Sequence, residues 1–254
     1  MFVAVTRPAP GVAWVRLDRP ERMNALSMEV VEHLHAALDD VEKDASLGAV
    51  VLTGTGRGFC SGGDIKEMET NRLKPVAERT ADLLRMHEIP ARLRAMDPVC
   101  IAAVNGAAYG AGFALALNCD IVLAAESARF GTAFLKQGLS SDWGLSYQLI
   151  RHAGPMKARR TLFLDEVLSA DAAERLGLVA EIVPDDRLAA RALELASRIA
   201  AHPADARIAL RRILQQAETA THQDMLDGEA KAQSALLTSP AHAAAVDGFL
   251  GHPA

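Results

Sequence analysis

One stretch, residues 99–125 with the sequence VCIAAVNGAAYGAGFALALNCDIVLAA, limits most strongly what this chain can fold into. It begins with a short apolar run, Val99 to Val104, that ends at the turn signal Asn105-Gly106, which predicts a buried strand. Glycines among small residues then lead into 113–117, where we expect the first turns of a helix. A strand, a glycine-rich turn and a helix start leave several backbone N–H groups without an intrahelical acceptor, at the positive end of the helix dipole.

Such N–H groups suit either a phosphate cradle or an oxyanion hole, in which fixed donors stabilise negative charge on a reacting carbonyl oxygen. The glycine spacing matches neither GxxxxGK[ST] nor GxGxxG, so the nucleotide-binding motifs are excluded. On this stretch alone a structural role, in which small residues let the helix pack closely, is an equal alternative.

Composition narrows the class of protein. A chain of 254 residues, half of them hydrophobic, can form one large domain or one domain with a small appendage. A net charge of −5 gives no reason to bind nucleic acid or an anionic membrane surface. No apolar run approaches the ~18 residues of a spanning helix, and no signal segment is recognisable, so we expect a cytoplasmic protein.

The cysteines and histidines indicate neither a disulfide framework nor a metal site. Cys60, Cys100 and Cys119 are odd in number and lack the spacing of metal ligands, which favours a reducing, cytosolic compartment. The eight histidines form no HExxH or similar pattern. We therefore predict no structural metal.

Strands alternate with helices through the first two thirds of the chain. Residues 12–17 and 48–53 read as strands, and Ser27 begins a helix with one apolar face. A second glycine-rich turn, GTGRGFCSGGDIKEM, covers residues 54–68. Over residues 69–97 we expect a helical segment that lies on the surface and is broken at Pro75 and Pro90.

Further strands, turns and helices follow the central stretch. We expect short strands at 121–124, 128–130 and 179–183, a turn at 138–144, and a helical stretch at 155–177 in which Ser169 is a plausible cap. From Asp185 onward the chain is helical to residue 250. These patterns predict an α/β domain over residues 1–184 and an α-helical region over residues 185–254.

Four segments, in this order, resemble the crotonase superfamily, also called the enoyl-CoA hydratase/isomerase family. They are DRPERMNAL at 18–26, GAVVLTGTGRGFCSGGDIKEM at 48–68, IAAVNGAAYGAGFALALNCDIVLAA at 101–125 and LSADAAERLGLVAEIVP at 168–184. The resemblance implies a spiral of repeated β-β-α units, C-terminal helices that build a trimer or a dimer of trimers, and acyl-CoA thioester substrates. It also implies no redox cofactor and no metal, with coenzyme A entering only as part of the substrate.

The family's functional residues carry over onto matching positions of this chain. The resemblance implies that the backbone N–H groups of Gly63 and Ala111 bind the thioester oxygen as it gains enolate character. It places Arg22 where a basic residue approaches the CoA phosphates, with a solvated surface arginine as the alternative. The remaining CoA or acyl-pocket residues are Ser61, Asp64, Ile65, Lys66, Tyr109, Phe134 and Trp143. A solvent-facing lysine is the alternative for Lys66, and core packing is an equal alternative for Tyr109 and Trp143.

Two departures from the family pattern bear on the reaction. Hydratases that resemble this chain use two glutamates to add water across a double bond, and those positions hold Ala114 and Phe134 here. Neither side chain can exchange a proton, so a hydratase of that mechanism is disfavoured. Asp142, in GLSSDWG, falls where members similar to the phenylacetate-pathway isomerases and the 4-chlorobenzoyl-CoA dehalogenases keep a working aspartate. The same sequence is also good turn chemistry, so a capping role is the alternative.

His87 falls where the dehalogenase-like members keep a histidine base, although a lone histidine on a mixed helix is more often structural. Three hypotheses therefore stay open. The first is a double-bond isomerase with Asp142 as the proton shuttle, which we favour. The second is a hydrolase or dehalogenase in which Asp142 attacks carbon and His87 activates water. The third is an acyl-CoA-binding scaffold without catalysis. The acyl group itself is not encoded in these motifs.

Overall fold

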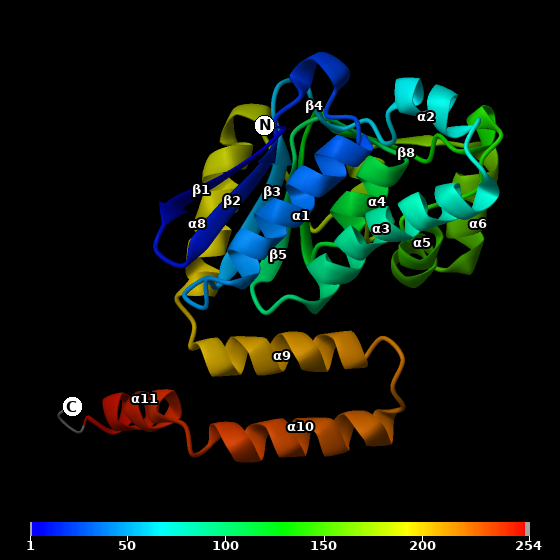
Figure 1. Ribbon diagram of the computed structural model, residues 1–254. Helices are drawn as coiled ribbons and strands as arrows, with labels where there is room; N and C mark the ends of the chain where they lie inside the picture. The colour runs from blue at the N-terminus through cyan, green and yellow to red at the C-terminus, as the bar shows by residue number, and fades with distance from the viewer. Residues whose placement is uncertain (1, 252–254) are drawn as a thin grey trace.

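Two β-sheets organise the chain, and from β3 to β8 consecutive strands alternate between them (Figure 1). The computed structural model describes residues 2–251. The larger sheet has the order β1-β2-β3-β5-β7-β10 and the smaller one the order β4-β6-β8-β9. The strands are β1 (Val3–Ala9), β2 (Val12–Leu17), β3 (Ala49–Gly54), β4 (Gly58–Cys60), β5 (Val99–Val104), β6 (Ala107–Tyr109), β7 (Ile121–Ala125), β8 (Arg129–Gly131), β9 (Val167–Ser169) and β10 (Glu181–Val183).

Eleven α-helices connect or follow these strands within residues 2–251. They are α1 (Met28–Glu42), α2 (Ile65–Asn71), α3 (Val76–Ala95), α4 (Ala111–Leu117), α5 (Leu145–Ala153), α6 (Pro155–Leu164), α7 (Ala170–Arg175), α8 (Leu188–Ala200), α9 (Ala204–Gln216), α10 (His222–Leu236) and α11 (Pro240–Leu250). Short 3-10 helices cover Pro20–Arg22, Leu135–Gln137 and Asp185–Arg187.

The predicted repeat of two strands and a helix is present. A long strand of the larger sheet is followed by a short strand of the smaller sheet and then by helix: β3, β4 and α2; β5, β6 and α4; β7, β8 and α5. Strands β2, β3, β5, β7 and β10 are mutually parallel, and only β1 pairs antiparallel in that sheet. Because helices cover both faces, β3 is apolar without alternation and buried at every residue.

Helix α1 follows its sequence pattern closely. The Ser27 side chain accepts a hydrogen bond from the N–H of Val30 at 3.3 Å and so caps the helix. The apolar stripe expected from the spacing is buried, namely Val30, Val31, Leu34, Leu38 and Val41. In Figure 1 α1 lies in front of the larger sheet, whereas α8 lies behind it and contacts β3 and β5.

Several local expectations were wrong. Strand β1 was not predicted, because VAVTRPA combines exposed polar residues with Pro8, which only an edge strand tolerates easily. The stretch 155–177 is not one helical segment, since β9 separates α6 from α7, although Ser169 does cap α7. Pro90 does not break α3 but lies buried inside it, where packing of Ile89, Pro90 and Leu93 offsets the lost backbone hydrogen bond.

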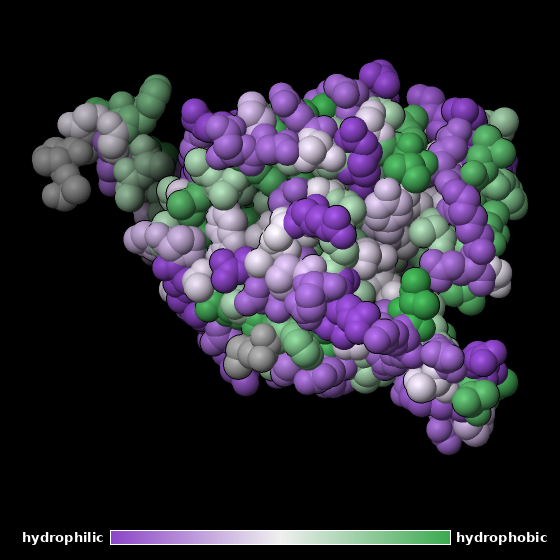
Figure 2. Space-filling model, turned by 90° about the horizontal axis from the view of Figure 1, so that it is seen from above, coloured by the Kyte–Doolittle hydropathy of each residue, from purple (hydrophilic) through white to green (hydrophobic). Residues whose placement is uncertain are grey.

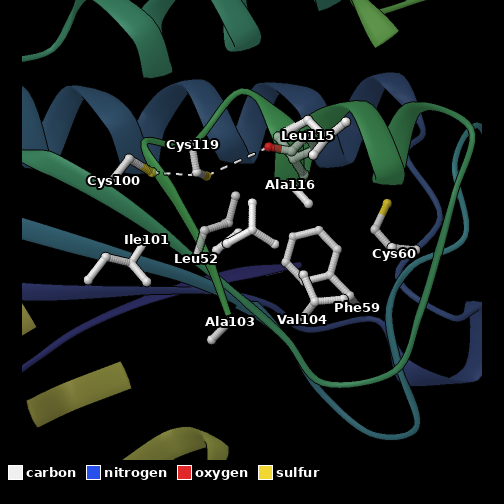
Figure 3. Close-up of a cluster of buried hydrophobic side chains, with 14 of the residues drawn as sticks. Leu52, Phe59, Cys60, Cys100, Ile101, Ala103, Val104, Leu115, Ala116 and Cys119 are labelled. Atoms are coloured by element: carbon white, nitrogen blue, oxygen red, sulfur yellow. Dashed lines mark hydrogen bonds between the residues drawn. The ribbon is translucent and has the colours of Figure 1, made fainter. Parts of the chain in front are cut away.

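Helix α4 lies at the centre of the hydrophobic core, and all seven of its residues are buried. Figure 3 shows Leu115 and Ala116 of this helix packed near Leu52, Phe59 and Val104. The thiol of Cys119 lies 3.7 Å from the carbonyl oxygen of Leu115 and 3.2 Å from the sulfur of Cys100. A helix enclosed in this way holds its first residue in a fixed place.

The C-terminal helices differ in how they contact the rest of the chain. Helix α8 packs on the larger sheet through Leu188, Ala192 and Ala196. Helix α9 is docked by Arg211, which is 6% exposed and whose Nε lies 2.9 Å from an Asp120 oxygen. Helices α10 and α11 bury no residue, and α11 extends away from the body of the molecule (Figures 1 and 2). The role of residues 185–254 in oligomerisation stays a prediction.

Candidate active site

The two glycine-rich turns predicted from the sequence meet in space. They follow β4 and β6, which are parallel neighbours in the smaller sheet. Gly62 has a φ of +91°, and a Cβ added there would lie 2.8 Å from the carbonyl oxygen of Tyr109. A Cβ on Gly112 would lie 2.1 Å from the carbonyl oxygen of Cys60. The two turns therefore contact each other backbone to backbone, which only glycine permits at these positions.

The N–H groups of Gly63 and Ala111 have no protein acceptor among residues 2–251, and neither have those of Gly112 and Phe113 in the first turn of α4. By contrast, the N–H of Asp64 donates to Leu26 and that of Gly110 to Gly131. Ala111 begins α4, so its N–H has no intrahelical partner. Since buried backbone donors are nearly always paired, the free donor of the buried Ala111, beside that of the half-buried Gly63, indicates a place for an external acceptor. These are the residues that the sequence predicted as the oxyanion hole.

Aromatic side chains border the same turn. The ring of Phe134 lies 3.7 Å from the position a Cβ would take on Gly110. Tyr109 packs against Gly131, and the rings of Tyr109 and Phe134 are both half-buried. Trp143 is 3% exposed and belongs to the hydrophobic core. Contact of these three residues with an acyl group stays a prediction.

Asp142 and His87 form a pair, although 55 residues separate them in the sequence. The Nε2 atom of His87, on α3, is hydrogen-bonded to the Oδ1 atom of Asp142, in the loop before α5. The N–H of Trp143 donates to the same Oδ1 atom at 2.8 Å. The two side chains are 37% and 30% exposed, so solvent or a ligand can approach them. Asp142 thus has both a turn contact and an ionisable partner.

The predicted CoA loop has one internal ion pair. Asp64 is 7% exposed, caps α2 through the N–H of Lys66 at 2.9 Å, and accepts from Arg19 Nη1 at 2.6 Å. Burial alone would raise the pKa of Asp64, but these hydrogen bonds outweigh it and hold the pKa below its usual range. The carboxylate of Asp64 is therefore engaged within the protein, where it fixes the turn that carries Gly63.

The other predicted CoA residues are at the surface. Arg22, Ile65 and Lys66 are exposed, and the hydroxyl of Ser61 donates to the carbonyl of Arg22 at 3.4 Å. The N–H of Ser61 donates to Met23 at 3.0 Å, which joins the segment of Arg22 to the segment of Lys66. Two exposed basic side chains thus lie on connected segments, as binding of an anionic group would need.

Sequence reasoning missed two residues that shape these turns. Arg19 holds Asp64, and Asn24 is 1% exposed and donates to the carbonyls of Gly58 and Phe59 at 2.8 and 3.1 Å. Asn24 also accepts from the N–H of Arg19 at 2.9 Å. Both lie in DRPERMNAL, so the motif pointed to the right segment although only Arg22 was selected from it.

Comparisons with known proteins identify the family of the chain. The sequence model of the family described as Enoyl-CoA hydratase/isomerase matches residues 8–251. The 1,2-epoxyphenylacetyl-CoA isomerase of Escherichia coli K12 is 36% identical over 241 residues, which are 94% of this chain and 92% of that protein. The 2,3-dehydroadipyl-CoA hydratase of the same organism is 36% identical over 207 residues, 82% of this chain and 79% of that one.

Solved structures agree as well. An enoyl-CoA hydratase from Polaromonas sp. JS666 superposes with a TM-score of 0.93 at 30% identity and covers 98% of this chain and 96% of its own. A monofunctional enoyl-CoA isomerase from M. smegmatis gives a TM-score of 0.74 at 37% identity, with coverage of 88% and 97%. The chain belongs to the enoyl-CoA hydratase/isomerase family and has the crotonase fold.

Neither a metal cluster nor a membrane-spanning helix is found in the described part of the chain. Among residues 2–251 there is no group of three or more His, Cys, Asp or Glu side chains that could hold a metal ion. Over the same residues, every helix is too short or too polar to cross a membrane. The expectation that the reaction needs no metal or redox cofactor stays a prediction.

Proposed function

We propose that this chain is an acyl-CoA isomerase that moves a double bond through an enolate. The observation that carries the proposal is the combination of free N–H groups on Gly63 and Ala111 with a partly exposed carboxylate, that of Asp142. Relatives of the family carry both isomerase and hydratase names, so the family alone leaves the reaction open. The two positions implied for the hydratase glutamates hold Ala114 and Phe134, which favours isomerisation.

The mechanism follows from the charges that develop. Removal of a proton from the carbon next to the thioester moves negative charge onto the thioester oxygen. The N–H groups of Gly63 and Ala111 would receive that charge, and a single oxyanion donor is worth roughly 3 to 4 kcal/mol in measured systems. Asp142 would take the proton and return it at the other end of the enolate system. No water is consumed, so the reaction needs no second acid.

His87 has a supporting role in this proposal. Hydrogen-bonded to Oδ1 of Asp142, it holds the carboxylate in one orientation, and the N–H of Trp143 fixes the same oxygen. The second oxygen, Oδ2, then points away from these two donors and is the atom that we assign to proton transfer. CoA would lie along Arg22, Ser61 and Lys66, while Tyr109, Phe134 and Trp143 would shape the acyl side.

An absorbance assay tests the proposed function. Enoyl-CoA thioesters with the double bond at either of two positions are incubated with the protein, and the conjugated thioester is followed by its absorbance. We expect interconversion of the two positional isomers and little loss of absorbance with a conjugated substrate alone. Rapid loss of that absorbance would indicate water addition and reject the isomerase.

A second candidate function has one observation in its favour. The direct His87–Asp142 hydrogen bond would also suit a hydrolytic or dehalogenating enzyme, in which Asp142 attacks carbon and His87 then activates water. In that reaction the Asp142 carboxylate displaces the CoA thiolate or a halide, so that the acyl or aryl group is held covalently on Asp142 until water releases it. A mass increase on the peptide that contains Asp142, trapped with His87→Gln, would favour this enzyme, whereas the isomerase predicts an unmodified peptide.

We also propose that the chain self-associates, most simply as a trimer. Helix α10 packs on α9, but neither α10 nor α11 contains a buried residue. Leu226, Val246 and Phe249 on these helices, and Leu237 directly after α10, are exposed. Burial of such residues against a second copy would stabilise an oligomer through the hydrophobic effect. Light scattering that gives the monomer mass of 27.1 kDa at micromolar concentration would reject this proposal.

A further inference from the structure

One buried side chain, that of Asn118, joins the helix that begins at Ala111 to the loop that carries Asp142. Asn118 follows the last residue of α4 and is 5% exposed. Its Nδ2 atom donates to the carbonyl of Trp143 at 3.1 Å and to the carbonyl of Ala114 at 2.8 Å. The side chain therefore ties the C-terminal end of α4 to the backbone next to Asp142.

The contact with Trp143 matters because of the backbone there. Trp143 has a φ of +53°, in the left-handed region that a bulky residue adopts only with backbone strain. Its N–H donates to Oδ1 of Asp142, while its carbonyl accepts from Asn118. Both peptide groups that flank Trp143 are thus fixed, one on the carboxylate and the other on α4. Asn118 holds the conformation that directs the carboxylate.

The amide of Asn118 is itself fully engaged. Its Oδ1 atom accepts from Nε2 of Gln148 on α5 at 3.0 Å, and Gln148 is 2% exposed. The side chains of Asn118 and Gln148 therefore form a buried chain of hydrogen bonds that ends at the carbonyls of Ala114 and Trp143. A satisfied polar network of this kind stiffens its surroundings, because every alternative geometry leaves a buried group unpaired.

We propose that Asn118 is a positioning residue that sets the place of the Asp142 carboxylate relative to the N–H groups of Gly63 and Ala111. The inference rests on the proposed function, in which Asp142 carries the proton. A base must lie within hydrogen-bond reach of the proton that it takes, and a misplacement of about 1 Å can cost about 10²-fold in rate. Asn118 does not contact the substrate in this proposal; it acts through Trp143 and Asp142.

A double-mutant cycle tests the proposal. Exchange of deuterium from solvent into a saturated acyl-CoA is measured for wild type, Asn118→Ala, Asp142→Asn and the double variant, each at saturating thioester. We expect Asn118→Ala to lower the turnover rate about 10- to 100-fold with KM changed little. In the Asp142→Asn background the same substitution should have no effect, because the group that it positions is gone.

A merely structural role would give a different pattern. If Asn118 only supported α4, its loss would disturb the Ala111 donor and lower the residual exchange of Asp142→Asn as well, and this result would overturn the proposal. An Asn118→Ala rate equal to wild type would also overturn it. If instead Asp142→Asn alone exchanges at the wild-type rate, the proposed function of Asp142 fails, which the cycle reports separately.

A second variant keeps the test decisive if Asn118→Ala does not fold. Gln148→Ala removes the hydrogen bond to Oδ1 of Asn118 and leaves Asn118 in place. We expect a smaller loss of turnover, of several-fold, which again disappears in the Asp142→Asn background. A Gln148→Ala protein that folds and exchanges at the wild-type rate would contradict the proposed chain of contacts.

Discussion

Replacing Gly62 with alanine should damage both stability and activity, because this glycine lies where the two donor turns touch. Its φ of +91° is a conformation that costs an L-residue about 1–3 kcal/mol. The added Cβ would lie 2.8 Å from the carbonyl oxygen of Tyr109, and backbone cannot rotate away as a side chain can. Overpacking of this kind costs about 1–3 kcal/mol more. We expect Gly62→Ala to lower the free energy of unfolding by about 4 kcal/mol.

Gly154→Ala is the matched control for this prediction. Gly154 has a φ of +77°, and a Cβ there would meet nothing within 4 Å, so only the conformational cost applies. Chemical denaturation of the two variants therefore separates the clash from the backbone strain. Equal losses for Gly62→Ala and Gly154→Ala would refute the close contact of the two turns.

The same substitution predicts a catalytic defect. The clash separates the segment of Gly63 from that of Ala111, and loss of one oxyanion donor typically lowers turnover about 10²–10³-fold. We expect a loss in that range for folded Gly62→Ala, measured by deuterium exchange below its melting temperature, and wild-type exchange for Gly154→Ala. A folded Gly62→Ala protein with unchanged exchange would contradict the assignment of the donors.

Three further predictions concern single side chains. Burial raises the pKa of Cys60 to about 12. Iodoacetamide at pH 8 should therefore alkylate Cys60 in the folded protein at least about 10³-fold more slowly than a free thiol, and peptide mapping measures this rate. The Arg19 hydrogen bond keeps the pKa of Asp64 below its ordinary value of ~3.9 despite burial. The stability that Asp64 contributes is therefore present above that pH and lost as the pH falls through the folded-state pKa. The difference in unfolding free energy between wild type and Asp64→Asn should therefore shrink from pH ~6 to pH ~2, and a difference independent of pH would exclude the ion pair. Arg211→Met removes the ion pair to Asp120 and the hydrogen bonds to the carbonyls of Leu93 and Arg94, so denaturation should show a loss of roughly 3 kcal/mol, and an unchanged midpoint would contradict the docking of α9.

Structural features that come from a clear period or a specific turn residue could be predicted from the sequence. The buried stripe of α1 repeats at helical spacing over four turns, and Ser27 begins it. The glycine-rich turn at 105–113 indicated free N–H groups on local grounds, since a strand followed by a helix leaves such groups in any fold. The choice of Gly63 and Ala111 as the donors depended on the resemblance to a family. The meeting of His87 with Asp142 depended on the resemblance to a family, because no local pattern links residues 55 positions apart.

Structural features that depend on tertiary contacts could not be predicted from the sequence. Strands β6 and β9 have three residues each, which is too short for an alternating pattern, and they exist because β8 lies between them. Pro90 stays helical because its neighbours are buried. Asn118 interrupts the apolar run LALNCDIVL, and this polar residue was the available signal for the buried network, but its partners lie 25 and 30 residues away.

The central claim is that Asp142 moves a proton at a carbon whose enolate is held by Gly63 and Ala111. Deuterium wash-in at the carbon next to the thioester of a bound acyl-CoA tests it most directly, with wild type and Asp142→Asn compared at equal occupancy and with a melting curve for each. Asparagine keeps the size of the side chain and its acceptor for Trp143 but cannot accept the proton. General acid–base catalysis contributes ~10²–10⁴-fold, so we predict a loss of that order with thioester affinity nearly unchanged. A folded Asp142→Asn protein that exchanges as fast as wild type would contradict the account and leave Asp142 as a turn residue.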